Sequence, residues 1–311
     1  MQRIGIISNP LSRAHQEGRA GLGTAAGLPH ASPEGRPALH AALADFAARG
    51  IGLLVVNGGD GTLREVLTAL PEAWPGSPPA IAPLAAGRTN LAARTLGQTG
   101  KGEAALRNLL AAAAEHRLRR QPRPVIEVAR LGEASAPLRG LLFGAAGFTE
   151  ATRLASGALH QRSLKDNAAV GVTALLVAAQ ALSGRGAHGK ALRRGTPMRV
   201  AVGDEAPADH ARFMLLATPL DQLMFGLWPF WGGGTGAIRW LDVAAPPQRL
   251  AAGLWSMLRR RAPGLPGWHS GRAASLRIGL DRPFVLDGEL FEPGPDGLLL
   301  TASAPVVFVA P

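Results

Sequence analysis

The sequence contains no cysteine and no tyrosine, and aromatic residues make up only 5% of its 311 residues. Without cysteine there is no disulfide, no thiolate metal site and no cysteine nucleophile. The low aromatic content argues against the stacking platforms that hold single-stranded nucleic acids. Helix-turn-helix, zinc-finger and aromatic ribonucleoprotein motifs are also missing from the sequence, so we expect no nucleic acid partner.

Long hydrophobic runs are also scarce, although 47% of the residues are hydrophobic. The longest run, AAVGVTALLVAAQAL at 168–182, is shorter than the roughly 20 apolar residues that span a bilayer, and we expect it to be a buried helix. The first residues, MQRIGIISNPLSR, lack the apolar core of a signal peptide. These features predict a globular, cytoplasmic protein, and its length suits two domains.

Positive charge is the strongest bias in the composition. Lysine and arginine total 33 against 22 acidic residues, which gives a net charge of +11, and nearly all the basic residues are arginine. A basic surface attracts anionic lipids or phosphorylated substrates. The alternative is that the abundance of arginine and alanine reflects the base composition of the genome, and the sequence leaves both explanations open.

The first third of the chain alternates between strand and helix patterns. Residues 3–7, 51–56 and 80–84 are apolar runs of strand length, and apolar residues at helical spacing over 39–47 and 63–70 separate them. Such alternation predicts a Rossmann-like, parallel α/β domain.

Three loops follow the expected strands, at 8–12, 57–62 and 85–90. In parallel sheets of this kind ligands bind at the carboxyl ends of the strands. We therefore expect the three loops to line one rim of the sheet.

The pattern changes beyond the charged, proline-containing segment RLRRQPRP at 117–124. From there on, short apolar runs alternate with period two, as in PMRVAVGD and SLRIGLD. This alternation is typical of antiparallel strands with one buried face. We therefore place a domain boundary after residue 122 and expect a second, β-rich domain.

The segment NGGDGT at 57–62 lies between a strand pattern and a helix pattern. Glycine lets backbone N–H groups approach a phosphate closely and permits positive φ angles, and the start of a helix adds a positive dipole. Asp60 would repel a phosphate unless Mg²⁺ lies between them. The alternative is a tight turn with a helix cap, although three glycines in four residues exceed what a cap needs.

A second acidic motif, FVLDGELF, places Asp287 and Glu289 on either side of Gly288 in an apolar strand pattern. Residues i and i+2 of a strand point to the same face, so we expect both carboxylates to project together. Such a pair suits phosphoryl transfer to an alcohol, in which one carboxylate accepts the hydroxyl proton and the other helps to hold Mg²⁺. The alternative is an Asp-Gly hairpin turn with a solvated glutamate.

Taken in order, these motifs resemble the diacylglycerol kinase catalytic domain family, which includes bacterial lipid kinases, ceramide kinases and sphingosine kinases. The NAD kinases share the GGDGT segment, and the phosphofructokinases have a slightly varied form. SNPLS at 8–12 resembles the family's first loop, PLAAGRTNLAAR at 83–94 its third loop, and LDGELF at 286–291 its late acidic motif. The resemblance covers nearly the whole chain.

The resemblance implies a two-domain fold. Residues 1–122 would form the nucleotide-binding α/β domain, and residues 123–303 an antiparallel β-sandwich domain for the lipid. The last strand, within 304–311, would return to the first domain.

The function that the resemblance implies is ATP- and Mg²⁺-dependent phosphorylation of a membrane lipid hydroxyl, as in diacylglycerol, ceramide or a sphingoid base. Glu289 is the implied base and Asp287 its Mg²⁺-binding or orienting partner, although the two roles could be exchanged. Asp60 would also help to place Mg²⁺. The implied nucleotide-binding residues are Asn9, Asn57, Gly58, Gly59, Gly61, Thr62, Gly87, Arg88, Thr89 and Asn90. A soluble-substrate kinase of the NAD kinase or phosphofructokinase type and a catalytically inactive lipid-binding relative are the alternatives.

The chain departs from the family pattern at three positions. Arg13 stands where glycine is usual, Arg88 where threonine is usual, and Leu91 where aspartate is usual. Arg88 could contact a nucleotide phosphate through two donors of its guanidinium. Alternatively, the changes at Arg88 and Leu91 mark a protein that has lost turnover.

A lipid kinase without a spanning helix must meet its substrate at the membrane surface, and we expect peripheral association with the inner face of the membrane. Anionic lipids would attract the positive net charge. The apolar loop FGLWPFWGGG at 225–234, with Trp228, Phe230 and Trp231, would insert at the interface or, alternatively, line the core. The sequence also leaves a homodimer open.

Overall fold

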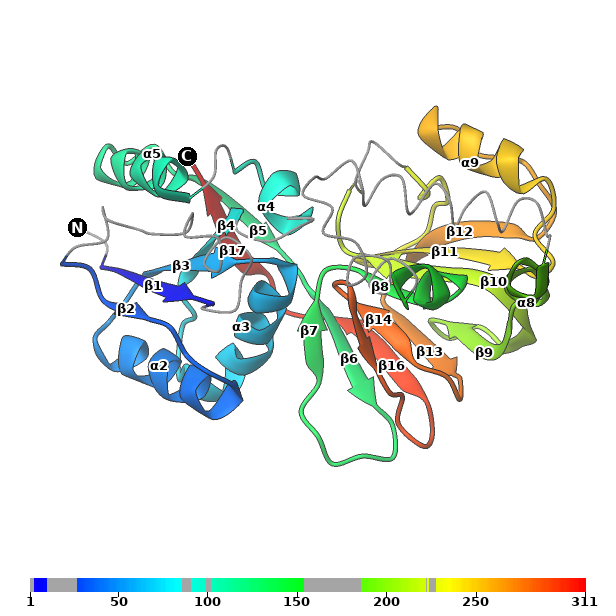
Figure 1. Cartoon of the computed structure of the whole chain (residues 1–311), viewed down its shortest axis with the longest axis horizontal. Coiled ribbons are helices and arrows are strands. Elements are labelled where there is room, and N and C mark those ends of the chain that lie inside the picture. Colours follow the sequence, from blue (N-terminus) through cyan, green and yellow to red (C-terminus); the bar gives the residue numbers. More distant parts are fainter. Residues whose placement is uncertain are drawn as a thin grey trace. The chain divides into compact units, whose positions relative to one another are not determined.

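The computed structural model describes residues 3–9, 27–85, 91–98, 102–153, 186–221, 223 and 228–311. The helix expected at 168–182 and most of the loops expected at 8–12 and 85–90 lie outside these residues. The chain divides into two compact units (Figure 1). Unit 1 comprises Met1–Val125 with Ser303–Pro311, and unit 2 comprises Ile126–Ala302.

Unit 1 contains a six-stranded sheet in which the order of strands is β2, β1, β3, β4, β17 and β5. The strands are β1 (Ile4–Ser8), β2 (His30–Ala31), β3 (Leu53–Gly58), β4 (Ala80–Ala85), β5 (Arg119–Arg123) and β17 (Val306–Ala310). All neighbours are parallel except β5, which is antiparallel to β17. The parallel α/β domain is therefore confirmed, and the last strand of the chain lies inside its sheet.

Helices cover both faces of this sheet (Figure 1). They are α2 (Arg36–Ala48), α3 (Asp60–Ala73), α4 (Leu91–Thr95) and α5 (Gly102–Ala114). Leu106 and Leu109 of α5 pack with Val55 of β3 in one core cluster. On the opposite face the ring of Phe46 from α2 lies so close to Gly5 that a Cβ there would be 3.0 Å from it. The apolar residues that predicted α2 and α3 are the ones that these helices bury.

Unit 2 is built on an eleven-stranded sheet in which every pairing is antiparallel. The main path runs β15, β14, β8, β10, β9, β13, β16, β6 and β7, and β11 with β12 branches from β10. The strands are β6 (Ile126–Arg130), β7 (Leu138–Gly140), β8 (Phe143–Ala146), β9 (Thr196–Val202), β10 (Ala208–Thr218), β11 (Ile238–Ala244), β12 (Trp268–Ala273), β13 (Ser275–Gly279), β14 (Phe284–Leu286), β15 (Glu289–Phe291) and β16 (Leu298–Ala302). The two helices labelled in this unit are α8 (Gly186–Arg194) and α9 (Leu250–Leu258).

The antiparallel β domain is one continuous sheet. The sheet curls so that its inner face encloses one core. Residues from strands far apart in the order, such as Val128 of β6 and Phe284 of β14, share one buried cluster. Phe284 also stacks on Phe143 of β8 and Phe291 of β15, with ring centroids 5.5 and 5.7 Å apart. Because β6, β13 and β16 bury alternate side chains, the period-two pattern is satisfied on their inner face, whereas β8 and β14 are buried at every residue.

A buried arginine is held at an irregular point of β10. Arg212 is 1% exposed and lies where the register with β11 shifts. Its Nε donates to Asp242 Oδ2 at 2.8 Å, and its other nitrogens donate to the carbonyl oxygens of Met198, His210 and Ala208. A buried charge is tolerated when it is paired and hydrogen-bonded in this way.

Within the part of the chain that the structure describes, no helix is long and apolar enough to cross a bilayer.

Candidate functional site

The GGDGT motif forms the turn between β3 and α3. Gly58 is the last residue of β3, Gly59 caps the helix with φ −89° and ψ −174°, and α3 begins at Asp60. The two glycines before Asp60 therefore do not use the positive φ angles that glycine permits. The reason for Gly58 is close packing, because a Cβ there would lie 2.5 Å from both Cβ and Oγ1 of Thr62.

Hydrogen bonds join this turn to the neighbouring strand. The side-chain amide of Asn9 donates to Thr62 Oγ1 at 3.0 Å, and the backbone N–H of Asn9 donates to the carbonyl oxygen of Asn57 at 3.2 Å. Asn57 Nδ2 donates to Ser8 Oγ at 3.2 Å. The structure thus brings together the expected nucleotide-binding residues at the ends of β1 and β3.

His30 is a member of this network that the sequence analysis missed. Its Nε2 lies 2.8 Å from Ser8 Oγ, and it belongs to β2, which pairs with β1. The side-chain oxygen Oδ1 of Asn57 is buried and has no hydrogen-bond partner among the described residues. Since buried polar atoms are almost always paired, this acceptor suits a donor from a ligand or a water molecule.

A small pocket lies beside the turn, at the carboxyl ends of β3 and β4. It is lined by Val56, Gly58, Gly59, Asp60, Leu63, Pro83, Leu84 and Ala93. Gly58 pairs with Ala85, the last residue of β4, so the third loop leaves the sheet next to the GGDGT turn. Its expected ligand-binding residues, Gly87, Arg88, Thr89 and Asn90, lie outside the described residues.

The first turn of α3 suits an anion and a divalent cation together. The N–H groups at the start of a helix lack partners within the helix and carry partial positive charge. Asp60 lies in this first turn and is only partly buried. Mg²⁺ is usually held by one or two carboxylates together with phosphate oxygens and water, so a single carboxylate at a phosphate site fits it.

One turn further along α3, charges hold the helix to α2. Arg64 is 2% exposed, and its Nη2 lies 2.6 Å from Glu65 Oε1. Glu65 Oε2 also accepts a 2.9 Å bond from Nε of Arg36 in α2. Burial raises the pKa of Glu65, but the hydrogen bonds and charges of Arg36 and Arg64 outweigh that effect and hold the pKa below its ordinary value of 4.5.

The late acidic motif does not form one strand. β14 ends at Leu286, β15 begins at Glu289, and these two residues pair across the hairpin. Asp287 and Gly288 form the two-residue turn, with φ of 49° and 84°. The expectation that both carboxylates project from one strand is therefore wrong, because two consecutive positive φ angles reverse the chain between them.

The carboxylate of Asp287 is occupied by backbone donors. Its Oδ1 accepts from the N–H groups of Leu141 and Leu142 at 3.1 and 2.8 Å, and its Oδ2 lies 3.0 Å from Leu141 N. The N–H of Asp287 donates in return to the carbonyl oxygen of Leu142 at 2.9 Å. Asp287 thus fixes the hairpin to the connection between β7 and β8, while Glu289 is exposed at the start of β15.

No three histidine or acidic side chains converge within metal-binding distance in the described ranges. The described residues therefore provide no ready-made metal cluster at Asp60 or at Asp287, the two residues expected to hold Mg²⁺. A metal ion at either residue would take most of its other ligands from phosphate and water.

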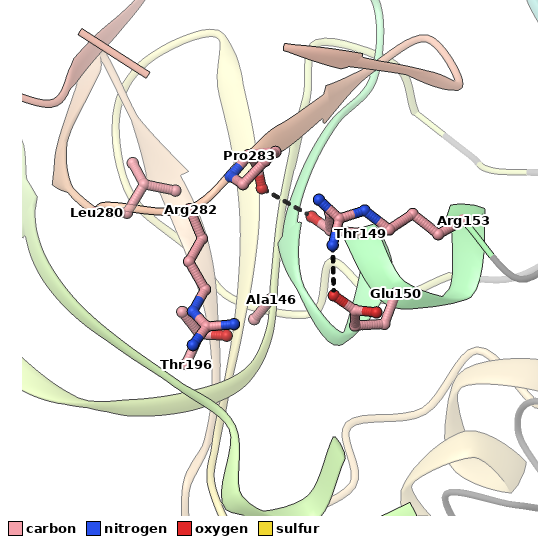
Figure 2. A pocket seen from close by; sticks show the side chains of 8 residues that line it. All are labelled: Ala146, Thr149, Glu150, Arg153, Thr196, Leu280, Arg282 and Pro283. Atoms are coloured by element: carbon pink, nitrogen blue, oxygen red, sulfur yellow. Dashed lines mark hydrogen bonds and ion pairs between the residues drawn. The ribbon is translucent and has the colours of Figure 1, made fainter. Parts of the chain in front are cut away.

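A separate pocket of about 180 Å³ lies in unit 2. Figure 2 shows Thr149, Glu150 and Arg153 on one side of it and Arg282 with Thr196 on the other. Thr149 donates to the carbonyl oxygen of Pro283 at 3.2 Å, and Arg153 contacts Glu150 at 3.1 Å. The lining is therefore mainly polar, and it includes Pro283, the residue before β14.

The N-terminal unit carries the sequence signature of a known family. The family model of the diacylglycerol kinase catalytic domain matches residues 28–118, which include the β3–α3 turn. Residues 28–118 thus resemble a diacylglycerol kinase catalytic domain. The resemblance seen in the motifs is thereby confirmed for this part of the chain. None of the curated proteins matches the chain.

Solved structures resemble this chain in the fold of both units. A Bacillus anthracis str. Sterne protein provisionally assigned as a diacylglycerol kinase is 14% identical, with a TM-score of 0.64, and the match covers 99% of this chain and 96% of that one. A diacylglycerol kinase structure from the same organism has a TM-score of 0.60 at the same identity and coverage. At this identity the likeness shows a shared two-domain fold. A yeast NADH kinase complexed with NADH, 11% identical over 100% of this chain and 84% of that one, has a TM-score of only 0.48, too low to favour a soluble substrate.

Proposed function

We propose that the protein is an ATP- and Mg²⁺-dependent lipid kinase that phosphorylates a hydroxyl group of a membrane lipid. Diacylglycerol, ceramide and sphingoid bases are the substrates that the family resemblance suggests. The observation that carries the proposal is the match of residues 28–118 to the diacylglycerol kinase catalytic domain, with Asp60 at the start of α3.

The nucleotide site in this proposal is the end of the sheet in unit 1. The N–H groups at the start of α3 would bind the phosphates, and Asn9 and Thr62 would hold the turn in shape through their 3.0 Å hydrogen bond. Asn57 supplies a buried acceptor without a partner among the described residues, which suits a donor group of the nucleotide or a bound water molecule. Asp60 would hold Mg²⁺, which neutralises phosphate charge when bound.

In this proposal the proton acceptor is Glu289, in the hairpin of β14 and β15. In the reaction the lipid hydroxyl oxygen forms a bond to the γ-phosphorus of ATP, and the bond from this phosphorus to the β–γ bridging oxygen breaks. The hydroxyl proton passes to the carboxylate of Glu289, and ADP leaves with the bridging oxygen. The backbone hydrogen bonds of Asp287 support a positioning role, because they leave Glu289 as the more accessible carboxylate.

The test is a transfer assay with the purified chain, labelled ATP, Mg²⁺ and a panel of lipids in mixed micelles. We expect one lipid to become labelled and Glu289→Gln to abolish most of the labelling without lowering the melting temperature. Labelling of a water-soluble alcohol such as NAD in place of any lipid would overturn the lipid assignment. Lipid binding with no transfer to any acceptor would instead identify an inactive relative.

A further inference from the structure

Helix α9 lies over β11 and β12 and has two apolar faces (Figure 1). Leu250, Gly253 and Met257 are buried on one face, where they pack against Trp268 of β12. A second stripe, one turn wide, contains Trp255 and Leu258, whose exposed fractions are 56% and 49%. A helix of a soluble domain normally turns such residues inward, so the second stripe requires an explanation.

The packing of α9 against β12 keeps Trp255 and Leu258 exposed. Gly253 rests on the ring of Trp268 so closely that a Cβ at Gly253 would lie 2.4 Å from the ring. Rotating α9 to bury Trp255 would drive larger side chains into that ring. Among the described residues the large exposed hydrophobic side chains are Trp255, Leu258 and Leu290, so two of these three lie on α9.

Positive charge adjoins the apolar stripe. Arg259, Arg260 and Arg261 follow α9 directly and are all exposed. The guanidinium of Arg259 lies 4.6 Å from the centre of the Trp255 ring, which joins the charged and apolar parts into one surface. No acidic residue occurs between Asp242 and Asp281, so this stretch of the sequence brings no negative charge to the surface.

We propose that the face formed by Trp255, Leu258 and Arg259–Arg261, the α9 face, docks onto an anionic lipid bilayer. Tryptophan and leucine enter the headgroup region while arginine contacts lipid phosphates, which is how amphipathic helices lie on a membrane. The partner is a bilayer because its surface matches both properties, an apolar interior under a layer of negative charge. The inference rests on the proposed function, since a lipid kinase must reach an acceptor that stays in the membrane.

The α9 face replaces the loop that the sequence suggested for docking. Phe230 is 4% exposed and Trp231 packs against the same core cluster as α9, so these residues line the core. The backbone N–H of Trp228 donates to the carbonyl oxygen of Met257 at 3.3 Å, which ties the loop to the end of α9. The described part of the loop, 228–234, therefore packs with α9 in one cluster.

The test is co-sedimentation of the full chain with vesicles across a salt series, in the absence of nucleotide and substrate. Vesicles of phosphatidylcholine mixed with phosphatidylglycerol are compared with pure phosphatidylcholine. The apolar variant is Trp255→Ser with Leu258→Ser, and the charge variant is the triple change of Arg259, Arg260 and Arg261 to Gln. The matched control changes three scattered, exposed arginines, Arg107, Arg120 and Arg194, to Gln and so has the same net charge.

We expect the charge variant to lose about a hundredfold in affinity for the anionic vesicles at low salt, on the scale of attraction of basic residues to an anionic surface. The scattered control should lose much less. The apolar variant should lose about tenfold or more, and this loss should persist at high salt because burial of apolar groups is not screened. All three variants should melt like the parent, because the substituted side chains are exposed.

Equal losses in the charge variant and the scattered control would overturn the proposal, since binding would then follow net charge alone. Parental binding by the apolar variant at high salt would overturn it as well. Kinase activity in mixed micelles is measured separately on the same proteins. If docking fails while micelle activity persists, the α9 face is wrong and the lipid kinase stands; if docking occurs without activity on any lipid, the proposed function is wrong.

Discussion

The side-chain amide of Asn9 donates a 3.0 Å hydrogen bond to the hydroxyl of Thr62, 53 residues further along the chain. This bond joins the end of β1 to the first turn of α3, and Gly58 makes it possible by leaving Thr62 the space that a Cβ would fill. The geometry of the β3–α3 turn therefore depends on a close approach between a strand and the helix that follows it.

Gly58→Ala should destabilise the protein. The new Cβ would lie 2.5 Å from Thr62 Cβ and Oγ1, and relieving this overlap should cost about 1–3 kcal/mol. The free energy of unfolding by urea measures the cost. The matched control is Gly233→Ala, because a Cβ at Gly233 has no neighbour within 4 Å. In a Thr62→Gly background the cost of Gly58→Ala should shrink; an unchanged cost would show that the contact is not the cause.

Asp60→Asn tests the proposed metal contact. The substitution keeps the size of the side chain but removes the charge that would hold Mg²⁺ near the phosphates. Turnover should fall by about a hundredfold or more, the scale of losing a preorganised electrostatic contact. Nucleotide binding without Mg²⁺, measured by titration calorimetry, should change little. Near-parental turnover would show that Asp60 does not hold a catalytic metal ion.

Asp287→Ala should lower stability more than Asp287→Asn. Alanine leaves the N–H groups of Leu141 and Leu142 without their acceptor, at a cost of about 1–3 kcal/mol. Asparagine keeps one acceptor oxygen and tolerates the φ of 49° better than alanine does. Thermal unfolding of the two variants gives the comparison. Equal melting temperatures for alanine and the parent would show that the carboxylate does not hold the hairpin.

The ion pairs of Glu65 should make the free energy of unfolding depend on pH. The pKa of Glu65 in the folded state is below 4.5, so its contribution is fully present above pH 4.5 and is lost as the pH falls through the folded-state pKa. Glu65→Gln should therefore cost about 1–3 kcal/mol at neutral pH, and the difference from the parent should shrink in acid. Urea unfolding at several pH values measures this. Glu72→Gln is the control on the same helix, because Glu72 is 75% exposed; a loss as large as that of Glu65→Gln would point to a general charge effect.

The local elements of unit 1 could be predicted from the sequence. The helical spacing of Leu39, Leu43 and Phe46 predicts α2, and these are the residues that α2 buries. The glycines of GGDGT lie between an apolar strand and an amphipathic helix, which predicts a strand–turn–helix with a ligand site. Patterns of this kind depend on neighbours within a few residues, so the sequence displays them directly.

The sequence by itself determined the strands β1, β3 and β4 and the helices α2 and α3 of unit 1, the antiparallel pattern of unit 2 and the motif that contains Asp60. Only the tertiary structure decided that His30 contacts Ser8, that Asp287 binds the N–H groups of Leu141 and Leu142, and that α9 exposes Trp255. Each of these facts joins residues from separate strands or depends on which helix face meets a sheet. Hydrophobic period and turn composition constrain φ, ψ and burial locally, whereas such pairings follow from the packing of whole elements, which no short segment of the sequence encodes.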